Sequence, residues 1–413
     1  MDNEPVKLIV DSDPGVDDVL ALLLALCSRD VDLKLISLVF GNCDTKNSLR
    51  NTVSLFHVLK LEEAYRHKQG QACPWQNKSK PKVSVGLTTA LDGSQLDATD
   101  FHGSDGLGNV HAQAPHFTAT KQHLDLFDSR AANAIEIEAE KAGFIPSHKP
   151  SYEDILDVLR TEPENTVTIV AIGPLQNLAK AAEMDPKTFA RVKNIVVMGA
   201  AINHPGNTTP LAEFNVYSDP LASAIIYSLT AKDPSVTLPI DSPEALKKFP
   251  KPLDVTIFPL DITEKHLLEQ PFFESFIQDY VTNGSPLAQW MQTWLRSTFE
   301  TAKKIYGTND GFSHLHDPLA LWYAVCVGLG QKDGWEIQEN VDVRVEYQGR
   351  WTQGMTVVDN RGRAKSSEQV PNDRDQWLTY GVGNRVHIAV SSPLPGARFG
   401  EELLRTILCT DEE

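Results

Sequence analysis

Cysteine is scarce in this 413-residue sequence, and its five cysteines are odd in number, widely spaced and without a CxxC pair. This excludes a zinc site of the usual spacing and a disulfide framework, and it indicates a reducing compartment. No apolar run reaches the roughly 18–20 residues needed to span a bilayer. No signal-peptide pattern precedes the first predicted strand, which begins at Lys7. We therefore expect a cytoplasmic protein with no membrane partner.

Basic residues are fewer than acidic ones, with 38 Lys and Arg against 55 Asp and Glu, and the formal net charge is -17. This balance argues against nucleic acid or an anionic membrane surface as the main partner. It is compatible with a neutral or cationic small-molecule substrate. The sequence contains no internal repeat and no low-complexity region, so we expect an ordinary globular fold.

Strand-like and helix-like segments alternate through the first half of the chain, which predicts an α/β fold with a mostly parallel central sheet flanked by helices. The predicted strands are 7–10, 33–40, 83–86, 166–171 and 194–199, and the predicted helices are 19–26, 47–59, 131–142, 175–184 and 287–305. Segments 341–347 and 355–358 predict a small peripheral sheet. We expect one domain over 1–413, with inserted surface segments near 62–81, 111–128 and 232–253.

Four carboxylates stand within eight residues, between the first strand and the first helix: Asp11, Asp13, Asp17 and Asp18. The carboxyl end of a strand is where open α/β sheets bind ligands. Two like charges ~4 Å apart repel by about 4 kcal/mol at an effective dielectric of 20. A turn residue and a helix cap could explain one or two of these acids. All four together favour a functional site with a hard cation such as Ca²⁺ or Mg²⁺, which takes oxygen ligands.

Other polar residues follow later predicted strands or precede helices. Asn42 follows the second strand, and His102 begins a glycine-rich loop that is not a P-loop. Asn207, Glu213 and Asn215 form a group suited to the hydroxyls of a sugar. His316 and Asp317 precede an apolar helix, where Asp317 could be only an N-cap. Together the pair offers a fifth acid and a titratable group.

These segments, in this order, resemble the nucleoside hydrolase family of the inosine- and uridine-preferring type. The similar stretches are DSDPGVDD at 11–18, VFGN at 39–42 with Asn51 after it, HGSDGLG at 102–108, AIGPLQN at 171–177, AEFN at 212–215, FPLDIT at 258–263, HDPLA at 316–320 and TQGMTVVD at 352–359. The similarity spans about 7 to 363. It implies hydrolysis of the N-glycosidic bond of ribonucleosides to ribose and free base, with Ca²⁺ as cofactor and a homo-oligomer, a dimer or a tetramer.

The resemblance also implies residue roles. The Ca²⁺ ligands would be the side chains of Asp13, Asp18 and Asp317, with Asp11 adjacent, and the backbone carbonyl of Ile172. Because the ligand at that position is a carbonyl, isoleucine is compatible with it. The 2′- and 3′-hydroxyls of ribose would be held by Asp17, Asn42, Asn215 and Asp317, and the 5′-hydroxyl by Asn207 and Glu213.

Hydrolysis of an N-glycosidic bond needs a base that takes a proton from water and a group that assists departure of the nucleobase. We assign Asp13 as the base, with Asn42 in the catalytic group. His316 is our first candidate for protonating the leaving base, and His102 is the second. Among other enzymes, an Asp-x-Asp phosphohydrolase or a nucleoside phosphorylase would need a cationic phosphate pocket, which the sequence does not show. A non-catalytic Ca²⁺-dependent ribose- or nucleoside-binding protein is the alternative from a different class.

Overall fold

The computed structural model describes residues 4–75, 78–128, 142–368, 370–394 and 396–408. A nine-stranded sheet forms its centre, in the order β10-β13-β7-β6-β5-β1-β2-β3-β4. Every neighbouring pair in this sheet is parallel except β10 and β13. The predicted α/β fold class is therefore confirmed. Because β1 lies in the middle of the order, the acids that follow it stand at the centre of one sheet edge.

The strands of the central sheet are short and mostly buried. They are β1 (Val6–Ser12), β2 (Val31–Leu38), β3 (Lys82–Val85), β4 (Ile145–Pro146), β5 (Val167–Ala171), β6 (Asn194–Met198), β7 (Val255–Phe258), β10 (Glu336–Val341) and β13 (Val386–Ser391). Two small antiparallel sheets pair β8 (Leu267–Glu269) with β9 (Phe312–His314) and β11 (Arg344–Val345) with β12 (Thr356–Val357).

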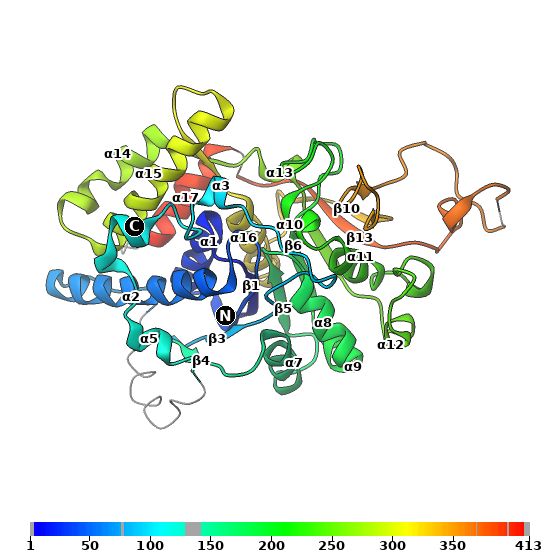
Figure 1. The fold of residues 1–413 in the computed structure, drawn as a ribbon, viewed down its shortest axis with the longest axis horizontal. Helices are drawn as coiled ribbons and strands as arrows, with labels where there is room; N and C mark the ends of the chain where they lie inside the picture. The colour runs from blue at the N-terminus through cyan, green and yellow to red at the C-terminus, as the bar shows by residue number, and fades with distance from the viewer. Residues whose placement is uncertain (1–3, 76–77, 129–141, 369, 395, 409–413) are drawn as a thin grey trace.

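Helices cover both faces of the sheet (Figure 1). The longer helices are α1 (Val16–Cys27), α2 (Thr45–Gln69), α7 (Ser151–Thr161), α8 (Gln176–Met184), α11 (Pro220–Ser228), α14 (Gln270–Thr282), α15 (Pro286–Tyr306), α16 (His316–Gly328) and α17 (Ala397–Leu408). Short helices are α3 (Thr99–His102), α4 (Val110–Gln113), α5 (Lys121–Asp125), α9 (Pro186–Phe189), α10 (Phe214–Ser218), α12 (Glu244–Lys247) and α13 (Leu260–Thr263). No helix in the described ranges is both long enough and apolar enough to cross a bilayer.

Alternation along β1 divides the core between the two faces. Leu8 and Val10 pack into a cluster that includes residues of α1, α2 and α14 to α17, whereas Ile9 packs into a second cluster with residues of α7, α8 and α11. Trp290 and Trp294 are fully buried in the first cluster, as their spacing on one helix face predicts. The acids at the end of β1 are thus fixed between two packed layers.

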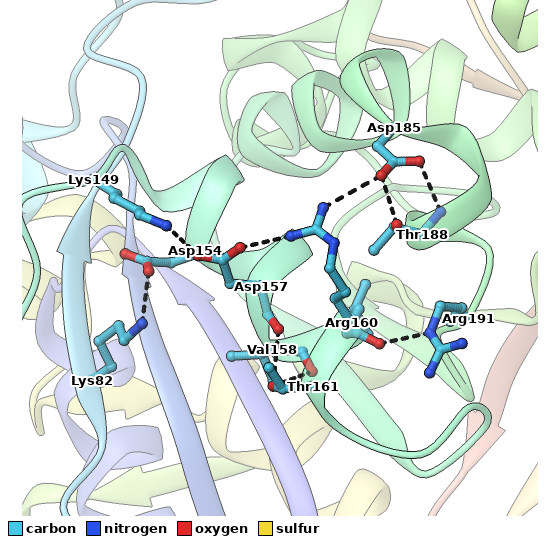
Figure 2. Close-up of polar contacts among 11 residues, drawn as sticks. Lys82, Lys149, Asp154, Asp157, Val158, Arg160, Thr161, Asp185, Thr188 and Arg191 are labelled. Atoms are coloured by element: carbon cyan, nitrogen blue, oxygen red, sulfur yellow. Dashed lines mark hydrogen bonds and ion pairs between the residues drawn. The ribbon is translucent and has the colours of Figure 1, made fainter.

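A network of ion pairs joins α7 to its neighbours on the second face (Figure 2). Asp157 accepts from Lys149 at 2.6 Å and from Arg160 at 2.7 Å, and Arg160 also lies 3.4 Å from Asp185. Hydrogen bonds to these cations lower the pKa of Asp157, and the Thr188 hydroxyl followed by Arg160 lowers that of Asp185. Asp157 and Asp185 each lie against at least one lysine or arginine that compensates the charge.

Three expectations need correction or fall outside the structure. Segment 62–81 is not all surface, because α2 continues to Gln69 and buries Glu62 and Arg66 as an ion pair of 2.8 Å. That pair is satisfied further by Ser285, the N-cap residue of α15, whose hydroxyl donates to Glu62. Segment 341–347 is not one strand, since Val341 ends β10 in the central sheet while β11 forms the predicted peripheral pair with β12. The predicted helix 131–142 lies almost entirely outside the described residues.

Candidate active site

A cavity of about 240 Å³ opens at the carboxyl edge of the central strands. Its lining comes from segments far apart in the sequence, and it contains Asp17, Asn42, Ala98, Phe101, His102, Ile172, Met198, Asn207, Thr208, Glu213, Phe214, Asn215, Ile305, Tyr306, Ser313, His314, His316 and Asp317. Every residue that the sequence predicts for substrate binding is in this set. The lining includes no Lys or Arg among the described residues, so no protein cation faces a ligand there.

Asp18 lies at the start of α1 and organises the turn before it. Its Oδ1 accepts from the Ser12 hydroxyl at 2.7 Å, and its Oδ2 accepts from the Gly15 amide at 3.1 Å and the Asn42 side-chain amide at 2.8 Å. An acid in the first turn also interacts favourably with the helix dipole. The same carboxylate therefore caps α1 and orients Asn42.

Asp13 is fully buried beside this turn. Its Oδ2 accepts from the Asn42 backbone amide at 2.6 Å, and its Oδ1 has no partner among the described residues. Gly41 and Gly173 pack directly against the carboxylate, and a Cβ at Gly173 would stand 2.6 Å from Oδ1. These positions thus need glycine because the backbone approaches the acid too closely for any side chain.

The carboxylates of Asp17, Asp18 and Asp317 form a cluster whose ligand atoms lie within 4.8 Å of one another. Burial, followed by repulsion between the acids, raises the pKa of Asp17 to about 8 and the pKa values of Asp13 and Asp317 well above their usual range. Asp317 Oδ1, like Asp13 Oδ1, is buried without a partner. Unpartnered oxygens in an uncompensated acidic cluster fit a hard divalent cation.

Asp11 differs from the other acids of its segment. Its Oδ1 accepts from the Ser37 hydroxyl of β2 and, at 2.9 Å, from the side-chain amide of Asn177 in α8. Burial raises its pKa to about 7. Asp11 is therefore held by a polar network inside the sheet, although its Oδ2 is buried without a partner among the described residues. Like Asp13, it is outside the cluster of Asp17, Asp18 and Asp317.

The amide and acid side chains predicted for the sugar also meet at this cavity. Asn215 donates to the backbone carbonyls of Ile172 at 3.0 Å and Met198 at 3.2 Å. Glu213 is buried and caps α10, with its oxygens accepting from the amides of Asn215, Val216 and Ala200. Asn207 is exposed at the rim and accepts from the Phe214 amide at 2.9 Å. Glu213 and Asn207 thus both accept hydrogen bonds from amides at the start of α10.

Two side chains that sequence reasoning did not single out fix the loop after β6. Asp261 accepts from the backbone amides of Ile202 and Asn203, at 2.9 and 2.7 Å. Thr356 of β12 donates to the Ala201 carbonyl at 2.5 Å. Both residues belong to stretches that carry the family resemblance, at 258–263 and 352–359. That membership was the available signal, but the sequence does not reveal their contacts.

Two histidines line the cavity, His102 at the end of α3 and His316 at the start of α16. His102 is buried, accepts from the Val16 amide at 3.3 Å through Nδ1, and has its pKa lowered to about 4 by burial. His316 contacts the Thr263 hydroxyl through Nδ1 at 2.7 Å, and burial lowers its pKa well below the usual value. The ring of His314 stacks on that of His316 with centroids 5.0 Å apart. Sequence reasoning missed Thr263 and His314.

Comparison with known proteins gives one consistent result. The family model described as inosine-uridine preferring nucleoside hydrolase matches residues 8–376. The chain is 27% identical over 357 residues to the inosine-uridine preferring nucleoside hydrolase of Leishmania major, covering 86% of this chain and 88% of that protein. It is 29% identical over 357 residues to a pyrimidine-specific ribonucleoside hydrolase of Salmonella newport, with the same coverage of both proteins.

Solved structures resemble the fold over nearly the whole chain. A plant nucleoside hydrolase has a TM-score of 0.67 at 23% identity, covering 98% of this chain and 99% of that one. A purine-preferring ribonucleoside hydrolase from Gardnerella vaginalis has a TM-score of 0.66 at 22% identity, covering 97% and 98%. At these identities the likeness establishes the fold alone.

Proposed function

We propose that this chain, which belongs to the inosine-uridine preferring nucleoside hydrolase family and is thus a hydrolase acting on N-glycosyl compounds, cleaves ribonucleosides to ribose and free base. The observation that carries the proposal is the shared cavity. Asp17, Asn42, Asn215 and Asp317 come from four segments of the chain and meet at one opening beside buried, unpartnered carboxylate oxygens. Side chains that can bind hydroxyls, next to a buried carboxylate with an unpartnered oxygen, suit the hydrolysis of a sugar derivative.

The cofactor that we propose is Ca²⁺, held by the side chains of Asp13, Asp18 and Asp317 and by the Ile172 carbonyl. Its support is the orphaned Oδ1 atoms of Asp13 and Asp317 and the close approach of Asp17, Asp18 and Asp317. When bound, such an ion neutralises the acids and lowers the pKa of water in contact with it.

Asp13 is proposed as the general base. Its free Oδ1 can take a proton from a water that attacks C1′ of the sugar, while the Asn42 backbone amide holds Oδ2. Asp17, Asn42, Asn215 and Asp317 hold the 2′- and 3′-hydroxyls, and Asn207 and Glu213 hold the 5′-hydroxyl. The anionic surroundings favour the positive charge that develops on the ribose as the bond to the base breaks.

Departure of the base is assisted by His316, and His102 is the second candidate. Both rings line the cavity, and both have Nδ1 engaged with the protein, to Thr263 and the Val16 amide respectively. Engagement of Nδ1 leaves Nε2 of each ring for the leaving base.

The test is a panel of purine and pyrimidine nucleosides in which free ribose is measured with and without a chelator. We expect ribose release that a chelator abolishes and Ca²⁺ restores. Ribose release that needs inorganic phosphate would instead indicate a phosphorylase. Calorimetric binding of nucleosides with no release of ribose would indicate the non-catalytic binding protein and would contradict the proposal.

A further inference from the structure

Thr263 is a fully buried residue that touches a proposed catalytic side chain from outside the cavity. It is the last residue of α13, and its Oγ1 lies 2.7 Å from Nδ1 of His316, which is 53 positions further along the chain. Thr263 is not among the residues that line the cavity, and its hydroxyl contacts the His316 ring, which does line it. Through this contact Thr263 can act on the reaction by way of His316.

The direction of this hydrogen bond follows from the surroundings of the hydroxyl. A threonine in a helix commonly donates to the carbonyl four residues earlier, but here that carbonyl, of Pro259, accepts from the amides of Ile262 and Thr263. Among the described residues, the His316 ring is the one hydrogen-bond partner of Thr263 Oγ1. The buried hydroxyl proton finds an acceptor among the described residues only if it points at Nδ1, and Nδ1 is then the unprotonated nitrogen of a neutral imidazole.

We propose that Thr263 is a positioning residue that holds His316 in the tautomer with its proton on Nε2, so that Nε2–H donates a hydrogen bond to the leaving nucleobase. This inference rests on the proposed function, because it assumes that a nucleoside base leaves beside His316. A ring without this contact could turn or carry its proton on Nδ1, and it would then offer the base an acceptor instead of a donor.

The stacked His314 ring supports the same orientation. It lies almost parallel to the His316 ring, at an interplanar angle of 25°, and so limits tilting of that ring. Stacking restricts the plane but does not distinguish one ring nitrogen from the other, whereas the Thr263 hydroxyl does. The two contacts together fix both plane and tautomer.

The chemical step balances without a full proton transfer from His316. The C1′–N bond breaks, its electron pair goes to the base, and the Nε2–H hydrogen bond stabilises the charge that develops on the base. Water supplies hydroxide to C1′, and its proton goes to Asp13. The departed base takes a proton from solvent, and Asp13 returns its proton there.

The test compares Thr263→Val, which keeps the shape but removes the hydroxyl, with Thr263→Ser, which keeps the hydroxyl. We expect Thr263→Val to lower kcat for the best nucleoside roughly 10- to 100-fold, with KM within about threefold of wild type. Thr263→Ser should retain most of kcat. On p-nitrophenyl riboside, whose phenolate leaves without help, Thr263→Val should keep wild-type kcat, and this also shows that the variant folds.

Two controls isolate the contact. Thr230→Val removes another fully buried hydroxyl, which donates to the Tyr227 carbonyl and accepts from the Arg385 amide, and it should leave kcat unchanged. In a His316→Ala background, Thr263→Val should lower kcat by less than about twofold further, because the two residues act as one unit. If Thr263→Val fails to fold, Thr263→Ala is read in the same way.

Full activity of Thr263→Val on nucleosides would overturn the inference, and so would an equal loss on both substrates or an additive effect with His316→Ala. Failure of the proposed function has a different signature, because wild-type protein would then release no base from any nucleoside.

Discussion

Carboxylates gather in two regions of this molecule, and the protein treats them in opposite ways. In the α7 network, Asp157 lies 2.6 Å from Lys149 and 2.7 Å from Arg160, and its pKa is lowered (Figure 2). At the carboxyl edge of the sheet, Asp13 and Asp17 are buried with other acids, and their pKa values are raised. Acids that the protein compensates hold the fold together, whereas the uncompensated acids are the ones that we propose to hold Ca²⁺.

The largest expected effect is on the reaction. Asp13→Asn keeps the shape of the side chain but cannot take a proton from water, so kcat for nucleosides should fall at least about 10³-fold. Steady-state release of ribose measures this effect, with Asp157→Asn as the matched control that should retain full turnover. Turnover of Asp13→Asn within tenfold of wild type would refute the assignment of the base.

A second prediction concerns Ca²⁺, pH and stability. Because burial raises the pKa of Asp17 from 3.8 to about 8, the metal-free native state binds more protons than the unfolded chain across that window. Its stability therefore falls as pH rises from about 4 to about 8. Ca²⁺ competes with those protons, so a concentration of 100 times the Kd at pH 8 should stabilise the protein by about 2.7 kcal/mol at pH 8 and by less at pH 5.

Thermal unfolding at both pH values, with Ca²⁺ and with chelator, measures this difference. Equal shifts of the midpoint at pH 5 and pH 8 would contradict the competition between protons and the ion.

The third prediction is a substitution that stabilises the protein, whereas most substitutions destabilise it. Asp17→Asn removes one charge from the uncompensated cluster, so the midpoint of thermal unfolding of the metal-free protein at pH 8 should rise by roughly 1–3 °C. The gain should disappear at pH 4, where the wild-type carboxylates are protonated. A lower midpoint at pH 8 would show that the repulsion is already relieved within the protein.

The smallest effect is expected in the α7 network. Asp157→Asn removes two surface ion pairs, whose cations Lys149 and Arg160 are about half exposed, so it should destabilise the protein by less than about 1 kcal/mol. Urea unfolding measures this change, and added salt should reduce it further. A loss of several kcal/mol would mean that these pairs are not solvent-screened.

The sequence was sufficient to bring together the part of the candidate site that stands at strand ends. Asp13, Asn42 and Ile172 each follow a predicted strand, and parallel strands bring such residues to one edge. Roles at that edge, including those of Asp13 and His316, stay proposals. The Thr263–His316 contact could not be predicted, since it joins two segments through tertiary packing and neither segment alone carries a signal for it.

Burial was the other property that local patterns did not reveal. Glu62 and Arg66 are spaced as an exposed i,i+4 pair, and only the packing of α15 and α17 against α2 encloses them. At the sheet edge, β10 combines exposed polar residues without clean alternation, so its pairing with β13 depends on a long-range contact.

The most direct test of the uncompensated cluster is the stoichiometry of Ca²⁺ binding, measured by calorimetry on protein freed of metal by dialysis. We predict one Ca²⁺ per chain for wild type and for Asp157→Asn, and loss of binding in Asp317→Asn. Absence of binding by wild type, or unchanged binding by Asp317→Asn, would contradict the claim that these acids hold the ion.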